Sequence, residues 1–173
     1  MRCFIAIPLP KEIQDEVRKT KVKDDIALVS YPKEELHLTL KFLGDVPVSE
    51  VKKISESLSK IKFKNFKTNL GKIGFFPKKK GYVKVVWAGL TPKRKIIELK
   101  NMVDDALVWR FNREKDYEPH ITICRVKEIK NDKRFRDTFN RTLEGSFSIN
   151  CFRLMKAEFT ENNVIHTLIK EYK

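Results

Sequence analysis

Two short segments of the sequence carry the same chemically useful side chains. His37-Leu38-Thr39-Leu40 recurs 83 positions later as His120-Ile121-Thr122-Ile123, and the two segments hold two of the chain's 3 histidines. Histidine exchanges a proton near neutral pH, so a pair of histidines can supply a general base and a general acid. Threonine hydroxyls can donate hydrogen bonds to phosphate oxygens as charge develops there. The repeated motif therefore predicts a phosphodiester-cleaving site in which His37 and His120 are catalytic and Thr39 and Thr122 bind the phosphate.

Each motif has the pattern of a half-buried β-strand. Alternation along a strand places His37 and Thr39 on one face and the flanking leucines in the core, and the same holds for His120 and Thr122. In a single motif of this kind, the histidine is usually a structural residue of the strand whose ring has a hydrogen-bond partner. The second copy, at a matched place in a repeat, favours the catalytic interpretation.

A metal site is the competing interpretation of the same residues. It would need a third or fourth ligand, and the motif faces offer no Asp, Glu or Cys apart from Cys124. We therefore expect neither a metal nor another cofactor. Cys3, Cys124 and Cys151 are widely spaced in apolar segments without a CxxC pair, which predicts reduced packing residues in a cytoplasmic protein.

The elements around the motifs also repeat. The same offset pairs Phe4 with Trp87, and 33 residues separate each of these aromatics from its histidine. Each half therefore has the order strand, helix, motif strand, which predicts two similar lobes related by a pseudo-twofold axis. The pattern is that of an α+β fold, and no linker or composition break divides it, so we expect a single domain over residues 1–173.

Hydrophobic periodicity predicts the individual elements. The expected strands are 2–9, 36–43, 63–70, 72–76, 82–90 and 121–126, with two more around a turn at 161–163. The expected helices are 10–20, a second one over 51–61 with Ser49 as a candidate N-cap, a third from Pro92 through Ala106, and 132–143.

The formal charge of +14 is the main compositional signal. Such an excess suits a polyanionic partner, because each neutralised phosphate releases counterions. A heat-stable surface decorated with Lys and Glu would also fit a chain in which 35% of residues are charged. No apolar run approaches the roughly 18 residues of a membrane span, and the first ten residues are too short for a signal peptide.

The two motifs with their flanks, Arg2-Cys-Phe-Ile-Ala-Ile, Leu36-His-Leu-Thr-Leu-Lys-Phe-Leu-Gly and Pro119-His-Ile-Thr-Ile-Cys-Arg, resemble the RNA 2′,3′-cyclic phosphodiesterases, also called 2′-5′ RNA ligases, of the two-histidine phosphoesterase superfamily. The resemblance covers essentially the whole chain. It implies two lobes, each an antiparallel sheet with helices on its outer face, around a central cleft. It also implies hydrolysis of a terminal 2′,3′-cyclic phosphate to a 2′-phosphomonoester, with a weaker, reversible 2′-5′ joining of tRNA halves. We expect the protein to be a monomer.

The resemblance also assigns roles to residues. It makes His37 the proton donor to the leaving O3′ and His120 the base that activates water, with Thr39 and Thr122 as phosphate-binding hydroxyls. Arg125 matches a phosphate contact, but simple alternation points it away from His120, so we expect a bulge or a strand end there.

Further contacts with RNA are expected at five other positions. Near the C-terminus, His166 stands where the family usually has Tyr, and it replaces that Tyr in packing or in base contact. Phe4 either packs in the core or stacks on a terminal base. Lys78, Lys79 and Lys80 form a basic hairpin tip that is either a solvated turn or an electrostatic guide for RNA.

Two alternative functions stay open at this point. One is a phosphodiesterase for ADP-ribose cyclic phosphate or another small cyclic nucleotide. The other is a basic RNA-binding module without catalysis. The charge favours RNA over a small nucleotide, and the two intact motifs argue against a non-catalytic module.

Overall fold

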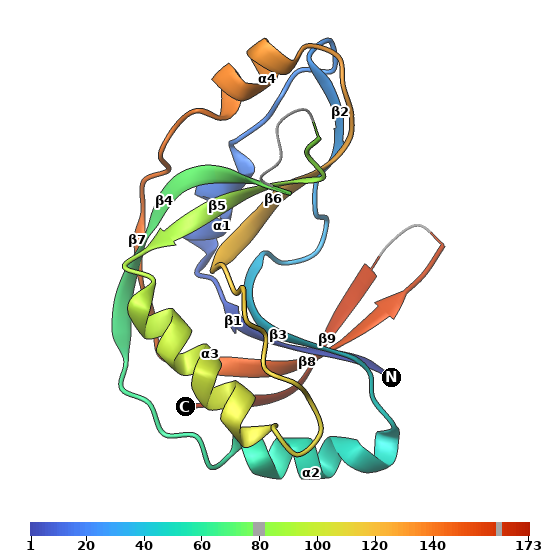
Figure 1. The fold of residues 1–173 in the computed structure, drawn as a ribbon, viewed down its shortest axis with the longest axis vertical. Helices are drawn as coiled ribbons and strands as arrows, with labels where there is room; N and C mark the ends of the chain where they lie inside the picture. The colour runs from blue at the N-terminus through green and yellow to red at the C-terminus, as the bar shows by residue number, and fades with distance from the viewer. Residues whose placement is uncertain (78–81, 162–163) are drawn as a thin grey trace.

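The computed structural model describes residues 1–77, 82–161 and 164–173. The described strands are β1 (Arg2–Pro8), β2 (Ala27–Ser30), β3 (His37–Asp45), β4 (Phe66–Phe76), β5 (Val85–Thr91), β6 (His120–Ile129), β7 (Ser146–Ile149), β8 (Phe152–Phe159) and β9 (Val164–Tyr172). The described helices are α1 (Lys11–Arg18), α2 (Val48–Leu58), α3 (Arg94–Ala106) and α4 (Asp132–Phe139). All of these strands belong to one strongly curved antiparallel sheet with the order β7-β4-β5-β6-β3-β1-β8-β9, and β2 pairs with β6 (Figure 1).

The curved sheet consists of two halves that meet at one residue pair. One half holds β3, β1, β8 and β9, and the other holds β7, β4, β5, β6 and β2. Within the described residues, β3 and β6 pair only through Leu38 and Ile121. These two residues are equivalent in the sequence repeat, so the pseudo-twofold axis passes between them. His37 and His120, one position earlier in each strand, are brought to this seam from opposite directions.

The same irregularity occurs at equivalent points of the two motif strands. The pairing of β3 with β1 skips Leu40, and the pairing of β6 with β5 skips Ile123. Such an extra residue is a β-bulge, and it changes which face the following side chains take. Lys41 and Cys124 are accordingly buried directly after the buried Leu40 and Ile123. The next residue in each strand therefore returns to the face of the motif histidine.

Two helices, α1 and α3, each cover the half of the sheet that does not contain the strand before them. α3 follows β5 in the chain yet packs against β3, where the Asp104 carboxylate lies 2.6 Å from the Lys41 ammonium. α1 follows β1 but lies behind β4 and β5 (Figure 1). A Cβ atom at Gly145 would lie 2.8 Å from Ile13 Cδ1 and 3.4 Å from Leu70 Cδ1, so α1 packs tightly against the β4 half. This exchange joins the two halves through one continuous hydrophobic core.

The two faces of β1 belong to two different hydrophobic clusters. Cys3, Ile5 and Ile7 point into the main core. Phe4 and Ala6 point the other way, into a small cluster with Ala157 of β8. Because the Phe4 ring contacts the His37 ring, this second face carries the first motif; we call it the cleft face.

The α+β fold with antiparallel pairing is confirmed, with several differences in its elements. The two strands expected over 63–70 and 72–76 form a single strand, β4, which begins only at Phe66, and α4 ends at Phe139 instead of continuing to 143. β2 and β7 were not expected, because four residues give too few positions for a periodic pattern. The turn expected at 161–163 falls partly outside the described residues.

The start of α2 also differs from the expectation. Ser49 is not the N-cap, because the helix begins at Val48 after Pro47, without a side-chain cap. The three cysteines are buried and free, as their apolar context predicts. No helix within the described ranges has the length and apolar character needed to cross a membrane.

Candidate active site

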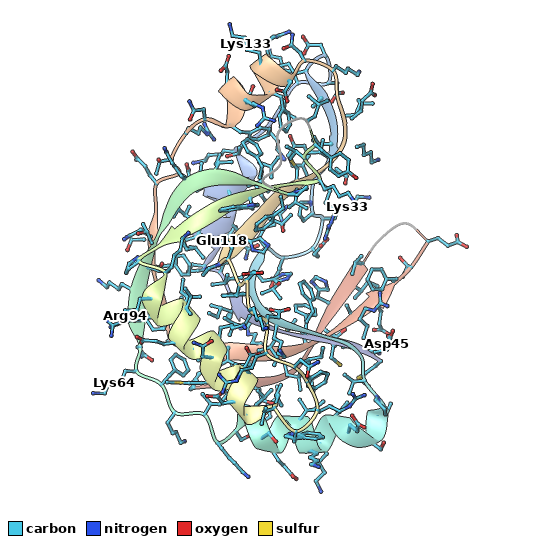
Figure 2. The ribbon with its side chains drawn as sticks, viewed as in Figure 1. Lys33, Asp45, Lys64, Arg94, Glu118 and Lys133 are labelled. Carbon is cyan, nitrogen blue, oxygen red and sulfur yellow. The ribbon has the colours of Figure 1, made fainter. Side chains whose placement is uncertain are left out.

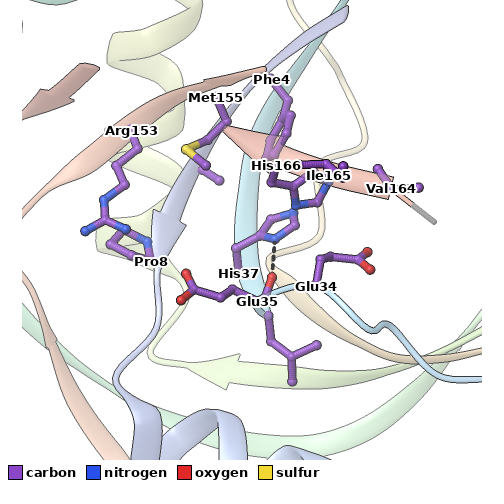
Figure 3. Close-up of a pocket in the computed structure, with 12 residues that line it drawn as sticks. Phe4, Pro8, Glu34, Glu35, His37, Arg153, Met155, Val164, Ile165 and His166 are labelled. Atoms are coloured by element: carbon purple, nitrogen blue, oxygen red, sulfur yellow. Dashed lines mark hydrogen bonds between the residues drawn. The ribbon is translucent and has the colours of Figure 1, made fainter. Parts of the chain in front are cut away.

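His37 lies at the seam end of β3 among other rings. Its ring centroid is 5.0 Å from that of Phe4 and 5.2 Å from that of His166. His37 Nδ1 lies 3.0 Å from the carbonyl oxygen of Glu35, two residues earlier (Figure 3). The ring is thus held by two neighbouring rings that also contact each other and by the backbone just before its own strand.

His120 is held in an equivalent way on β6. Its ring centroid lies 6.0 Å from that of Trp87, the counterpart of Phe4, and 5.0 Å from that of Phe76. His120 Nδ1 lies 2.7 Å from the carbonyl oxygen of Glu118. Glu118 occupies the place of Glu35 in the repeat and lies at the centre of the molecule, whereas Arg94 lies on the outer surface (Figure 2).

These carbonyl contacts fix the tautomer of both rings. A carbonyl oxygen can only accept a hydrogen bond, so Nδ1 of His37 and of His120 must carry the proton and donate it. In the neutral form Nε2 is then unprotonated, and it is the atom at which each ring gains or loses a proton. Both rings therefore present the same proton-exchanging atom to the cleft.

The surroundings favour the neutral form of both histidines. Burial lowers the pKa of His37, the Glu35 carbonyl opposes this in part, and the nearby His166 and His120 lower the pKa further. Burial also lowers the pKa of His120; the Glu118 carbonyl and carboxylate oppose this, and the Arg125 charge adds to the lowering. The pairing of Leu38 with Ile121, each one residue after a histidine, brings the two rings to the same seam.

Thr39, Thr122 and Arg125 lie on the histidine faces of the two motif strands. Thr39 and Thr122 are half-buried, two residues from their histidines, and neither hydroxyl has a hydrogen-bond partner within the described part of the chain. The expected bulge is present at Ile123, so alternation returns the exposed Arg125 to the face of Thr122. Its influence on the pKa of His120 agrees with this placement.

A pocket of about 280 Å³, which we call the His37 pocket, opens beside the first motif (Figure 3). Its walls include the ring of Phe4 and the apolar side chains of Met155 and Val164, and Glu34 and Arg153 supply charge. A second pocket of about 420 Å³, the His120 pocket, lies on the other side of the motifs. It is lined by His120 and Thr39 together with aromatic and charged side chains, namely Phe42, Phe76, Tyr117, Lys41, Lys115, Glu114, Asp116 and Glu118.

Phe4 and His166 both belong to the His37 pocket. Phe4 is only 4% exposed and packs in the small cluster of the cleft face, while the edge of its ring also lines the pocket. His166 of β9 lies opposite Ala157 and has its ring 4.8 Å from that of Phe4. Lys78, Lys79 and Lys80 lie outside the described residues.

A buried ion cluster behind the site was missed from the sequence. The Asp104 carboxylate receives the ammonium groups of Lys41 at 2.6 Å and Lys100 at 2.5 Å, and all three side chains are buried. The two lysines also donate to the carbonyls of Asn112 and Glu114, which fastens the loop between α3 and β6. The only signal in the sequence is a lysine two residues after Thr39 in the first motif strand, and simple alternation would place Lys41 on the histidine face and not in the core. The bulge at Leu40 buries it.

Other site residues had no usable signal in the sequence. Phe76 contacts the His120 ring from β4, and Tyr117 donates to the Thr39 carbonyl at 2.9 Å from the loop before β6. Neither lies in a recognisable motif, and both reach the site through tertiary packing. Among the described residues, no group of three or more His, Cys, Asp or Glu side chains is placed to hold a metal ion.

Comparisons with known proteins agree with this geometry. The family model described as LigT like phosphoesterase matches residues 7–87. An RNA 2′,3′-cyclic phosphodiesterase of Methanocaldococcus jannaschii is 35% identical over 99% of this chain and 100% of the relative, and one of Escherichia coli K12 is 32% identical over 72% and 71%. The crystal structure of E. coli LigT complexed with 3′-AMP superposes with a TM-score of 0.77 at 26% identity, covering 98% of this chain and 95% of that one.

Proposed function

The chain belongs to the family of RNA 2′,3′-cyclic phosphodiesterases, and from this we propose that it hydrolyses a terminal 2′,3′-cyclic phosphate of RNA to a 2′-phosphomonoester. The observation that carries the proposal is the symmetric pair of histidines at the seam. Each donates from Nδ1 to its own backbone and presents Nε2, and a threonine hydroxyl without a partner in the described chain lies two residues away. Two proton-transfer atoms and two phosphate donors are the parts that metal-free phosphodiester hydrolysis needs.

The reaction assigns one role to each histidine. His120 takes a proton from water at Nε2 as the water oxygen forms a bond to phosphorus. His37 gives a proton from Nε2 to O3′ as the P–O3′ bond breaks, so the phosphate stays on O2′. Thr39, Thr122 and Arg125 donate to the non-bridging oxygens, where negative charge grows. The His37 pocket then holds the nucleoside whose O3′ leaves.

The two alternative functions are not favoured. Relatives from Methanocaldococcus jannaschii, Archaeoglobus fulgidus, Methanothermobacter thermautotrophicus and Aquifex aeolicus, which align with at least 99% of this chain, are each named RNA 2′,3′-cyclic phosphodiesterase, which favours RNA over ADP-ribose cyclic phosphate as the substrate. The intact histidine pair opposes a non-catalytic binding module. We also propose that residues 1–173 act as one monomeric catalytic domain in the cytoplasm on RNA ends such as tRNA halves. The shared core and the free, buried cysteines support this part of the proposal.

A single assay tests the proposed reaction. The protein is incubated with a short RNA that ends in a 2′,3′-cyclic phosphate, in the presence of EDTA, and the product is identified by ³¹P NMR. We expect full activity with the chelator and a 2′-phosphomonoester as the product, because the motif faces offer two imidazoles and two hydroxyls but no complete set of metal ligands. A 3′-phosphate would reverse the assignment of the leaving oxygen. If EDTA abolished the activity and added zinc or manganese restored it, the metal-free mechanism would be wrong.

A further inference from the structure

A side chain connects the two motif strands in addition to their backbones. Within the described residues, β3 and β6 pair only through Leu38 and Ile121, and one residue pair fixes where two strands meet but not the angle between them. The Tyr117 hydroxyl supplies a second connection, because it donates to the Thr39 carbonyl oxygen at 2.9 Å. Tyr117 precedes the second motif and Thr39 belongs to the first, so this hydrogen bond crosses the seam.

The carbonyl that accepts this hydrogen bond lies at an irregular point of β3. The pairing of β3 with β1 skips Leu40, directly after Thr39. A bulge disrupts the ladder locally, and a carbonyl that is partly shielded from water needs a hydrogen-bond partner. The Tyr117 hydroxyl provides one. Burial raises the pKa of Tyr117, so the hydroxyl keeps the proton that it donates.

The position of Tyr117 is itself fixed by the protein. Its ring packs against the main core, and the Lys100 ammonium lies 5.4 Å from the ring centroid. Lys100 is paired with Asp104 and also donates to the Glu114 carbonyl at 2.9 Å, so the same ammonium holds the loop that carries Tyr117. The hydroxyl is therefore placed independently of any bound substrate.

The other half of the repeat has no equivalent of this contact. Glu34 holds the place of Tyr117 under the offset of the repeat, and a carboxylate can only accept a hydrogen bond, so it cannot donate to the Thr122 carbonyl. The Glu34 side chain lines the His37 pocket instead. The two motif threonines, equivalent in sequence, are thus held in different ways.

We propose that Tyr117 is a positioning residue, which sets the angle between the two motif strands and so directs the Thr39 hydroxyl at the reacting phosphate. This rests on the proposed function, because it takes Thr39 to donate to a non-bridging oxygen. Tyr117 does not bind the phosphate itself, since its one hydroxyl proton is used on the Thr39 carbonyl. Precise placement matters here, because a displacement of about 1 Å can lower a rate by about 10².

A double-mutant cycle tests whether Tyr117 acts through Thr39. We would measure kcat and KM on a cyclic mononucleotide for Tyr117→Phe, for Thr39→Val and for the two changes together. Tyr117→Phe keeps the ring and should lower kcat by about 10-fold to 100-fold, with KM changed by less than about threefold, because charge grows on the non-bridging oxygens in the transition state. In the Thr39→Val background the same change should cost less than about twofold, whereas in a Thr122→Val background it should keep its full effect.

Tyr172→Phe is the matched control. The Tyr172 hydroxyl donates to the Ser55 hydroxyl at 3.0 Å, and its ring belongs to the main core. This variant therefore also removes one tyrosine hydrogen bond, but on an element that does not carry a motif. We expect its kcat to stay within about twofold of the wild type, and urea unfolding of both tyrosine variants compares their effects on stability.

Three results would overturn the proposal. If Tyr117→Phe cost as much without the Thr39 hydroxyl as with it, Tyr117 would not act through Thr39. A higher KM with unchanged kcat would make Tyr117 a substrate contact in the His120 pocket. A lower stability with unchanged kcat would make the hydrogen bond a feature of the fold alone.

The same cycle can be measured without turnover. The Kd of inorganic phosphate, determined by titration calorimetry, should rise in Tyr117→Phe and should not rise further when the change is made in Thr39→Val. If the wild-type protein hydrolyses no cyclic phosphate, the proposed function fails, and this phosphate cycle still decides the role of Tyr117. Independent losses of phosphate affinity in the two variants would show that the two residues are not coupled.

Discussion

At the scale of single residues, each candidate catalytic histidine is oriented by a peptide group two positions earlier in its own chain. This contact needs no partner from another element, so the same short segment that supplies the ring also sets its tautomer. The aromatic neighbours then restrict how the ring can turn. Phe4 and His166 do this for His37, and Trp87 and Phe76 do it for His120.

Removing either imidazole should stop the reaction. His37→Ala and His120→Ala each delete one of the two proton-transfer atoms, and we expect each to lower kcat on a cyclic-phosphate substrate by at least about 10². Thermal unfolding of the variants serves as the control for an intact fold. If either variant kept an activity within about tenfold of the wild type, that histidine would not be the general acid or base.

The pH dependence follows from the lowered pKa values. One histidine must be protonated and the other neutral, so the rate should be bell-shaped with its maximum between the two pKa values. Burial lowers the pKa of His37 and of His120 below the ordinary histidine value of about 6.5, so the maximum of kcat/KM, which reports the free enzyme, should lie below about pH 6.5. A bound phosphate raises both pKa values, so the maximum of kcat should lie at higher pH. A kcat/KM maximum above about pH 7.5 would contradict the assignment.

At the scale of elements, the buried ion cluster connects α3, β3 and the loop that precedes β6. Burial by itself raises the pKa of Asp104, but the hydrogen bonds and charges of Lys100 and Lys41 outweigh it and lower the pKa overall. The aspartate is therefore ionised at neutral pH, and the cluster holds two positive charges and one negative charge away from water. Such a group is stable only while every charge keeps its partner.

Breaking this cluster should destabilise the whole chain. Asp104→Asn leaves two buried ammonium groups without a counter-charge, and we expect it to lower the free energy of unfolding in urea by about 3–5 kcal/mol. Lys100→Met is the matched control, because it leaves the Lys41–Asp104 pair neutral and intact, and its loss should be less than half as large. Equal losses in the two variants would mean that packing, and not charge pairing, is what the cluster contributes.

At the scale of the whole molecule, the large positive charge suits a long polyanionic substrate. If it binds RNA, each phosphate contact releases counterions and makes the affinity depend on salt. The reaction at the terminal phosphate involves few such contacts. The charge thus predicts different salt responses for long and short substrates.

This difference can be measured directly. Affinity for a long RNA should fall steeply with salt, whereas turnover of a cyclic mononucleotide should not. Replacing Lys78, Lys79 and Lys80 together by Ala should flatten the slope of log affinity against log salt by up to about 3, at about 0.7–0.9 for each phosphate that is no longer neutralised. Mononucleotide hydrolysis is the internal control. Equal salt sensitivity for both substrates, or an unaltered slope in the triple variant, would mean that the three lysines do not bind RNA. The positive charge would then serve the stability of the protein.

The sequence by itself determined the features that depend on local pattern and on repetition. Alternation placed His37 with Thr39 and His120 with Thr122, because a strand has only two faces and the flanking aliphatics had to enter the core. The constant offset related the two halves, and the residues equivalent under that offset, Leu38 and Ile121, are the ones that pair at the seam. The long helices and strands were found for the same reason.

Tertiary structure decided everything that depends on contacts between distant segments. The bulges at Leu40 and Ile123 turn Lys41 inward and bring Phe42 and Arg125 to the cleft face, and they arise from pairing with β1 and β5, not from local propensity. The exchange of α1 and α3 between the halves follows from which apolar faces remain to be covered. A single chain segment encodes which face a side chain can take, but the neighbours that make that face a cleft, a core or an ion cluster are supplied by the rest of the fold.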